Sequence, residues 1–187
     1  MSKSKEIISD KVAVVNQILP HTNKWAWDLF IDGAANNWMP TEISMAKDIE
    51  QWRSSSLTED EKLVVKRSLG FFAGSESLVA NNLLLSIFKY VTDAECRQYI
   101  LRQAYEESLH NLTVVYVCDS LNLDIDEVYQ AYNSIPSIKS KDEFLMNITS
   151  DINRPDFNIN TIEGKREFLR NIITYYIICE GIFFFFV

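Results

Sequence analysis

The sequence predicts an all-α protein built as a helical bundle. Glycine and proline occur five and four times among the 187 residues, so few positions would interrupt a helix. Hydrophobic residues make up 47% of the chain, which is enough to form a substantial core. In the longest segments the apolar residues recur at intervals of three and four, the spacing of one helix face. Two long helices and a third, apolar one favour an antiparallel bundle.

The first half of the chain is expected to begin with an amphipathic helix over residues 22–37. The proline of WMPTEIS then fixes an extended stretch, because the residue before a proline avoids helical backbone. A short turn of helix is expected at 44–51. Serine and threonine followed by acids form a capping signature, so a long helix is predicted over 58–90, with a bend at Gly70 or Gly74.

The second half is predicted to hold another long helix and several shorter ones. The long helix starts near Thr92, where acids stand in its first turn, and reaches about Leu121. At ~1.5 Å per residue, each of the two long helices is on the order of 45 Å long. Further helices are expected at 124–133, at 141–149 and from Thr161 to the end.

Composition and charge argue against several classes of function. The formal net charge is −8, and a nucleic-acid partner is not expected because phosphate binding needs a basic face. The three cysteines form no CxxC pair, which predicts buried, reduced thiols in a cytoplasmic protein. The apolar end, IITYYIICEGIFFFFV, is shorter than the ~20 residues of a membrane-spanning helix and carries Glu180. We therefore expect no membrane partner and a helix buried inside the protein.

Glu107 and His110 stand three residues apart on the second long helix, so their side chains share one face. Di-iron and di-manganese carboxylate proteins hold their metals with such Glu-x-x-His pairs and with single glutamates from two further helices. Glu76 and Glu180 stand in apolar segments, where an ionised carboxylate needs a partner. Either acid alone would be explained more simply by pairing with Arg or Lys, or by protonation. Three acids on three helices, together with one imidazole, favour a metal site.

By residue count, the chain supplies half of a two-metal site. It has two histidines, His21 and His110, and no second Glu-x-x-His. His21 precedes the first helix in a turn and is expected to face solvent. A full set of ligands for two metals is therefore not present in these 187 residues.

Four stretches, ANNWMPTEISMAKDIEQW, LGFFAGSESLVANN, RQAYEESLHNLTVVYV and YYIICEGIFFFF, together resemble the small, radical-generating subunit of class I ribonucleotide reductase. The resemblance implies a ferritin-like helical bundle, with residues 22–187 as one incomplete domain after an N-terminal segment, 1–21. It implies an oxidoreductase whose dinuclear metal centre activates oxygen and passes an oxidising equivalent to a separate large subunit. That subunit reduces ribonucleotides to deoxyribonucleotides for DNA replication. A cytoplasmic homodimer is expected on the same grounds.

The resemblance also assigns roles to individual positions. It makes Glu76 the ligand from the first long helix, Glu107 the bridging carboxylate and His110 the imidazole on the same metal. Glu180 matches the first ligand of the second metal. Trp38 resembles the family's electron-transfer tryptophan on the route toward the large subunit, and a core aromatic is the alternative reading.

One departure from the family pattern concerns the radical. The usual radical tyrosine falls four residues after the histidine, where this chain has Val114, so no tyrosyl radical can form there. The motifs are closest to the tyrosine-less subgroup, which implies a Mn/Fe centre, with Fe/Fe as the alternative. Tyr105 and Tyr116 lie well off the face that carries Val114. Phe184, four residues after Glu180, matches an apolar residue that lines the metal pocket.

The second departure is the ending. The family continues into a helix with a second Glu-x-x-His and a tail that docks on the large subunit, whereas this chain stops at Val187 inside an apolar run without a cap. C-terminal truncation is therefore expected. Two alternatives stay open. One is a ferritin-like ligand-binding oxidase, which also carries valine at the radical position. The other is a non-catalytic, truncated helical fragment that serves dimerisation or interaction.

Overall fold

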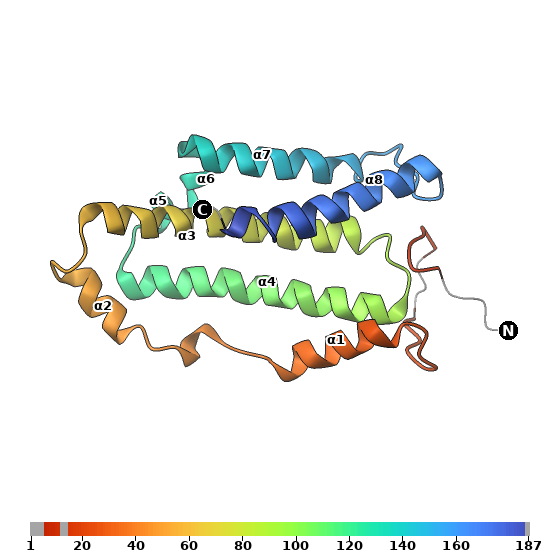
Figure 1. Cartoon of the computed structure of the whole chain (residues 1–187), viewed down its shortest axis with the longest axis horizontal. Helices are drawn as coiled ribbons and strands as arrows, with labels where there is room; N and C mark the ends of the chain where they lie inside the picture. The colour runs from red at the N-terminus through yellow and green to blue at the C-terminus, as the bar shows by residue number, and fades with distance from the viewer. Residues whose placement is uncertain (1–5, 12–14, 186–187) are drawn as a thin grey trace.

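The computed structural model describes residues 6–11 and 15–185, whose regular structure consists of helices and an isolated bridge between Ile8 and Val91. The predicted all-α class is confirmed, and Figure 1 shows the long helices as roughly parallel rods. None of the helices within the described ranges combines the length and apolarity needed to cross a bilayer. The expected end at Val187 and the start of the segment 1–21 lie outside the described residues.

The helical elements follow the predicted order. The described residues form eight α-helices: α1 (Lys24–Ala35), α2 (Ala46–Arg53), α3 (Glu59–Asn81), α4 (Ala94–Leu121), α5 (Ile125–Tyr129), α6 (Ala131–Ser134), α7 (Pro136–Asp151) and α8 (Ile162–Ile173). Two π-helical segments extend α3 and α8, namely η2 (Asn82–Ile87) and η3 (Thr174–Cys179). Short 3-10 turns are found at η1 (Pro40–Glu42) and η4 (Phe183–Phe185).

Side-chain caps fix the starts of both long helices. At the start of α3, the Thr58 hydroxyl accepts from the Glu61 N–H, and the Glu61 carboxylate accepts from the Thr58 N–H. At the start of α4, the Asp93 carboxylate accepts from the Glu95 N–H. Asn122 ends α4 in the left-handed region, with φ of 53°. The predicted helix starts near 58 and 92 are therefore matched by specific hydrogen bonds.

The irregular part of the first long helix lies later than expected. α3 is continuous through Gly70 and Gly74 and gives way to the π-helical η2 at Asn82. A Cβ on Gly70 would lie 2.4 Å from the Cβ of Ala131 and 3.0 Å from the carbonyl oxygen of Val128. The glycine therefore allows close contact with α5 and α6 rather than a bend.

The later helices also differ from the prediction. The region 124–133 is divided into α5 and α6, and the helix expected at 141–149 begins earlier, at Pro136, since proline is favoured in the first turn of a helix. The single helix expected from Thr161 onward changes from α8 to the π-helical η3 and then to turns. These changes in helical type matter for the site, because η3 leads directly into a predicted ligand.

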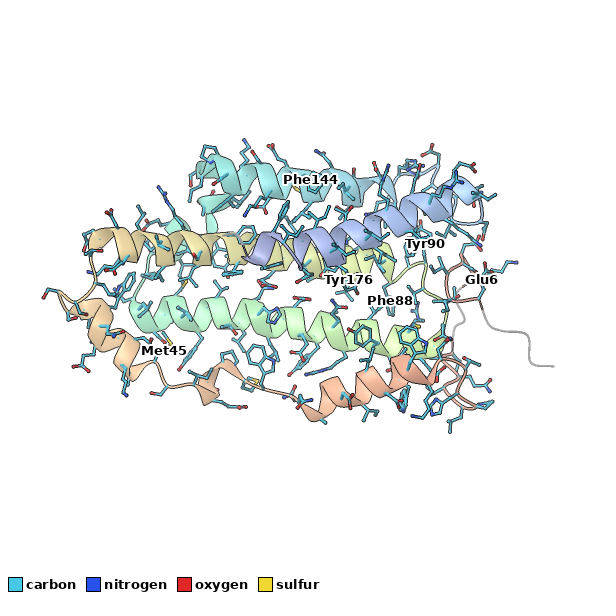
Figure 2. All side chains as sticks on the ribbon, in the orientation of Figure 1. Glu6, Met45, Phe88, Tyr90, Phe144 and Tyr176 are labelled. Atoms are coloured by element: carbon cyan, nitrogen blue, oxygen red, sulfur yellow. The ribbon has the colours of Figure 1, made fainter. Side chains whose placement is uncertain are left out.

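Two of the three apolar clusters formed by the described residues link the long helices around the predicted site. A main cluster joins α3, α7, α8 and η3 and includes Val79, Ile152, Phe168 and Tyr175. Tyr90 lies in the same cluster, at the connection between α3 and α4 (Figure 2). A second cluster between α3, α4 and α5 surrounds Val114, Ala73, Cys118 and Val128. α1 packs along the first half of α4 (Figure 1). The predicted carboxylates lie between these two apolar clusters.

Candidate metal centre

Glu76, Glu107 and His110 converge between the two long helices. Glu76 belongs to α3, whereas Glu107 and His110 are one turn apart on α4. One possible ligand atom from each residue lies within 4.8 Å of the other two. His110 Nδ1 is 3.0 Å from Glu107 Oε2 and 3.1 Å from Glu76 Oε2. The structure thus brings together three of the four residues predicted as ligands.

The two carboxylates of this group are buried, while the imidazole reaches solvent. Glu76 is 7% exposed and Glu107 is 4% exposed, and the His110 side chain is 43% exposed. Within the described ranges, His110 is the ion-pair partner of both carboxylates. The simpler reading, in which these acids are paired with lysine or arginine, is therefore not what the described residues show.

The electrostatics of the group favour a positive charge between the carboxylates. Burial raises the pKa of Glu107, and the neighbouring Glu76 adds to this rise while His110 opposes it. Hydrogen bonds to Glu107 and Glu76 raise the pKa of His110 to about 10. Without a metal, the positive charge is a proton on His110. A divalent cation meets the same need, and two carboxylates with one imidazole are ligands that iron and manganese accept.

Glu180 lies next to this group and is held by a tyrosine. It directly follows η3, and its Oε1 accepts a hydrogen bond from the Tyr175 hydroxyl at 2.8 Å. Burial raises the pKa of Glu180, and the carboxylate interacts electrostatically with Glu107 and His110. The 4.8 Å group itself contains Glu76, Glu107 and His110. The fourth predicted ligand is therefore a neighbour of the group and not one of its members.

Trp38 packs against the imidazole at the edge of the site. The Trp38 and His110 ring centroids are 6.0 Å apart, with 30° between the ring planes. The indole Nε1–H donates to Glu106 Oε2 at 2.9 Å. Arg102 binds the other carboxylate oxygen of Glu106 and also donates to Asn37 Oδ1. Trp38 is thus fixed in contact with a predicted ligand and remains partly exposed.

The side chains around the predicted radical position carry no hydroxyl toward the carboxylates. Val114 is 4% exposed and packs in the cluster between α3, α4 and α5. Tyr105 is exposed, and the Tyr116 hydroxyl donates to the carbonyl oxygen of Ile43 at 2.8 Å. Both tyrosines therefore point away from the face that carries Val114, as the helical spacing predicts.

Phe184 belongs to an aromatic group beside the second core cluster. Its ring stacks on Phe72 with centroids 5.5 Å apart and 10° between the planes, and it also meets Phe71 at 5.6 Å. Phe72 in turn packs against the cluster that contains Val114. Phe184 also packs against the cluster of Phe71, Ala131 and Ile138.

His21 lies away from the carboxylate group. Its Nδ1 is 2.6 Å from Oε1 of Glu95, near the start of α4. The other oxygen of Glu95 accepts from the backbone N–H groups of Thr22 and Asn23. His21 is exposed and precedes α1, as expected, but its contact with Glu95 was not predicted. His21 thus helps to hold the start of α1 against the start of α4.

Sequence reasoning missed the two side chains that hold predicted site residues. Glu106 holds Trp38, and Tyr175 holds Glu180. Glu106 was visible as a second acid beside a predicted ligand. Tyr175 stands five residues before Glu180, a spacing that does not form a face in an α-helix. The pattern therefore gave no signal for this contact.

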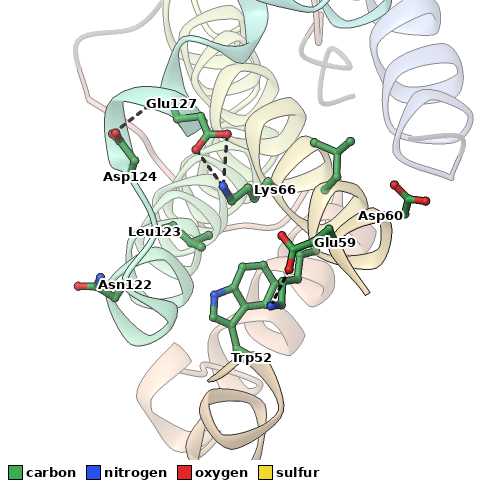
Figure 3. A pocket seen from close by; sticks show the side chains of 10 residues that line it. Trp52, Glu59, Asp60, Lys66, Asn122, Leu123, Asp124 and Glu127 are labelled. Atoms are coloured by element: carbon green, nitrogen blue, oxygen red, sulfur yellow. Dashed lines mark hydrogen bonds and ion pairs between the residues drawn. The ribbon is translucent and has the colours of Figure 1, made fainter. Parts of the chain in front are cut away.

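A separate cavity of about 530 Å³ lies near the start of α3 and the end of α4 (Figure 3). Its lysines are paired with acids, Lys66 with Glu127 at 3.0 Å and Lys62 with Glu59 at 3.1 Å. Lys66 is ten residues from Glu76, which is ~15 Å along a helix. This cavity is therefore distinct from the carboxylate group, and the acids that line it outnumber its lysines by four to two.

The chain matches a family model described as ribonucleotide reductase, small chain, over residues 15–186. It is 50% identical over 181 residues to ribonucleoside-diphosphate reductase subunit beta of Chlamydia pneumoniae, covering 97% of this chain and 52% of that protein. A small subunit of the same enzyme from Arabidopsis thaliana is 28% identical over 163 residues, covering 84% of this chain and 44% of that protein. The chain thus spans about half the length of the curated relatives it matches.

A solved structure gives the same result for the fold. The ribonucleotide reductase R2 subunit from Clostridium botulinum matches with a TM-score of 0.74 and 25% identity, covering 98% of this chain and 59% of that chain. This likeness confirms the ferritin-like bundle predicted from the sequence. The region matched by the family model includes all three residues of the carboxylate group. It also includes their two neighbours, Trp38 and Glu180. The chain belongs to the ribonucleotide reductase small chain family.

Proposed function

We propose that this chain carries the metal-binding machinery of a class I ribonucleotide reductase small subunit. Glu76, Glu107 and His110 would hold a first metal ion, and Glu180 would contribute to a second one, with Glu107 available to both. The bound centre supplies an oxidising equivalent derived from oxygen, and a separate large subunit uses it to reduce ribonucleoside diphosphates. The convergence of two buried carboxylates and one imidazole within 4.8 Å carries this proposal.

The residues of the chain set the properties of such a site. Glu76 and Glu107 offset the charge of a divalent cation, and their burial keeps competing water away from the ligand oxygens. His110 contributes a neutral nitrogen once its proton has left. The four residues come from α3, α4 and the turn after η3, so the site is formed when these three segments pack together.

Val114 supports a centre that keeps its oxidising equivalent on the metals. The valine is buried and has no oxidisable hydroxyl, and Tyr105 and Tyr116 point elsewhere. We therefore infer a Mn/Fe pair, with Fe/Fe as the alternative. The donor set fits both, because iron and manganese accept carboxylate and imidazole ligands alike.

Trp38 is the proposed residue through which an electron reaches the site from the large subunit. It touches the His110 ring and remains partly exposed, so it links the protein surface to a proposed ligand. This contact favours a reductase over a ligand-binding oxidase, which would need no partner subunit. We also propose that residues 22–187 act as one domain and that the subunit is a cytoplasmic homodimer.

The ligand count predicts unequal affinities for the two ions. The first ion has three ligands from the carboxylate group, whereas the second would need a further Glu-x-x-His pair, which the 187 residues do not contain. His21 is engaged by Glu95 at the start of α4. We therefore expect this chain to bind one ion tightly and a second one weakly.

Two adjacent glutamates allow a matched test of the proposal. The chain is loaded anaerobically with Mn²⁺ and Fe²⁺, desalted and analysed for metal content. We expect close to one tightly bound ion per chain, and loss of that ion in Glu107→Gln. Glu106→Gln is the control, because Glu106 holds Trp38 and is not a proposed ligand. If Glu107→Gln retained as much metal as Glu106→Gln, the metal proposal would be wrong and a non-catalytic helical fragment would be favoured.

The link to the large subunit needs a separate assay. Wild type and Trp38→Phe are mixed with a large subunit, and co-purification, metal content and ribonucleotide reduction are measured. We expect Trp38→Phe to keep its metal and its binding to the large subunit but to lose reduction. Co-purification of the wild type with the large subunit would favour the reductase over the oxidase and the fragment.

A further inference from the structure

The Tyr175 hydroxyl is a buried donor fixed on one oxygen of Glu180. The distance from this hydroxyl to Glu180 Oε1 is 2.8 Å, and Tyr175 is 3% exposed. A phenol can donate through its O–H, whereas an ionised carboxylate can only accept. Tyr175 therefore acts as a donor, and Glu180 Oε1 as the acceptor.

The π-helical segment η3 makes this contact possible. Residues five apart in an α-helix are about 140° apart around the axis, so their side chains diverge. Here the Glu180 N–H donates to the Tyr175 carbonyl oxygen at 3.1 Å, which is an i to i+5 hydrogen bond. This wider turn brings the Glu180 side chain nearer to the face that carries Tyr175, within reach of its hydroxyl. Single π turns are frequent at functional sites, and this one precedes a proposed ligand.

Tyr175 has little freedom to follow a moving carboxylate. Its ring packs in the main core cluster with Val79 and Cys179. The next residue, Tyr176, points to α4 instead (Figure 2), where its hydroxyl donates to Gln103 Oε1 at 2.7 Å. The two tyrosine rings meet edge to face, with centroids 4.9 Å apart. The core thus fixes the position of the Tyr175 hydroxyl, and the hydroxyl fixes Glu180.

We propose that Tyr175 is a positioning residue that reserves Oε1 of Glu180, so that Glu180 binds metal through Oε2 alone. The inference rests on the proposed function and deepens it. A carboxylate can bind a cation through one oxygen or through two. A donor held at Oε1 satisfies that oxygen and holds the carboxylate in one orientation, which leaves Oε2 for the cation. One-oxygen binding leaves room for other ligands on the second ion, the one that shares Glu107.

Tyr175→Phe tests this role, because it removes the hydroxyl and keeps the ring. Wild type and variant are titrated with Mn²⁺ beyond one equivalent, and binding of the second ion is followed by the electron paramagnetic resonance signal of the coupled pair. We expect second-ion affinity to fall 10- to 100-fold, as is usual when a hydrogen-bond partner of a ligand is removed, and the coupled signal to change shape. Tyr176→Phe, the matched control, should match the wild type.

Glu180→Gln separates this proposal from the proposed function. If Glu180→Gln weakens the second ion but Tyr175→Phe titrates like the wild type, the positioning role is wrong and the metal proposal stands. If Glu180→Gln and Glu107→Gln both bind metal like the wild type, the proposed function fails as well.

Infrared spectroscopy of the wild type keeps the test valid if Tyr175→Phe fails to fold. The spectrum of the metal-loaded chain minus the metal-free chain reports the splitting of the carboxylate stretches, and Glu180→Gln identifies the bands of Glu180. A wide splitting, typical of one-oxygen binding, is the expected result. A narrow splitting, typical of binding through both oxygens, would overturn the proposal.

Discussion

Metal binding should release a proton from His110. Hydrogen bonds to Glu107 and Glu76 raise the pKa of this imidazole from 6.5 to about 10, so at pH 7.5 the metal-free site holds the proton. A metal ion needs the neutral imidazole. About one proton should therefore leave for each ion bound, whereas an imidazole with the ordinary pKa would release only about 0.1 proton at this pH.

The protonation of His110 also predicts how the affinity of the chain for metal depends on pH. While His110 is protonated in the metal-free chain, the apparent association constant should rise about tenfold for each pH unit, up to the pKa of the imidazole. At lower pH the dependence should become steeper, because burial also raises the pKa of Glu107 and a second proton then competes with the metal.

The stability of the metal-free chain should fall as the pH rises, whereas the affinity for metal rises. A pKa raised on folding contributes stability that is fully present below pH 6.5 and is lost as the pH rises through about 10. A rise from 6.5 to about 10 corresponds to about 5 kcal/mol at face value. Because the His110 side chain is 43% exposed, solvent screening reduces this to about 1–2 kcal/mol. The melting temperature without metal should therefore fall between pH 6.5 and 10.

Calorimetry gives the proton count directly. Mn²⁺ is titrated at pH 7.5 into the chain in two buffers with different ionisation enthalpies, and the difference in heat gives the protons released. His21→Gln removes the other histidine and should leave the count near one, whereas His110→Gln should bring it close to zero. A wild-type count near 0.1 would refute the reasoning, because it would mean that the carboxylates do not hold a proton on His110.

Three further predictions concern the packing and capping of the bundle, each measured by denaturant unfolding of the metal-free chain. Phe168 is 0% exposed in the main core, so Phe168→Ala should lower the free energy of unfolding by about 3–5 kcal/mol. A Cβ at Gly70 would lie 2.4 Å from the Cβ of Ala131, so Gly70→Ala should be destabilising by about 1–3 kcal/mol through overpacking, despite the better helix propensity of alanine. Thr58→Ala removes the cap shared with Glu61 and should lower the free energy of unfolding by about 1 kcal/mol. For each of the three variants, a denaturant midpoint equal to that of the wild type would contradict the prediction.

The parts of the fold that follow from local spacing could be predicted from the sequence. Both long helices start where the capping residues stand. Glu107 and His110 share a face because three residues make almost one helical turn. Glu76 was identified from its apolar surroundings, and the structure places it beside them. The agreement is good here because the pattern and the structure have the same period of 3.6 residues.

The parts that could not be predicted depend on a change of helical period or on contacts between distant segments. The π turn between Tyr175 and Glu180 has no signature in the spacing of apolar residues, so the contact that holds Glu180 was not visible. The role of Gly70 was also hidden, because the segment that approaches it lies about sixty residues further along the chain. In both cases the decisive partner is fixed by tertiary packing.

Glu106 and Glu107 show how one helix divides two tasks between adjacent acids. Neighbouring residues of a helix are about 100° apart around its axis, so Glu107 turns toward Glu76 while Glu106 turns toward Trp38. His110 joins the two sides, because its Nδ1 faces the carboxylates and its ring faces the indole. A positive charge on the imidazole favours the contact with the indole face. A metal that took the place of this proton would again bring positive charge to the site, so we expect metal binding at the carboxylates to be coupled electrostatically to Trp38.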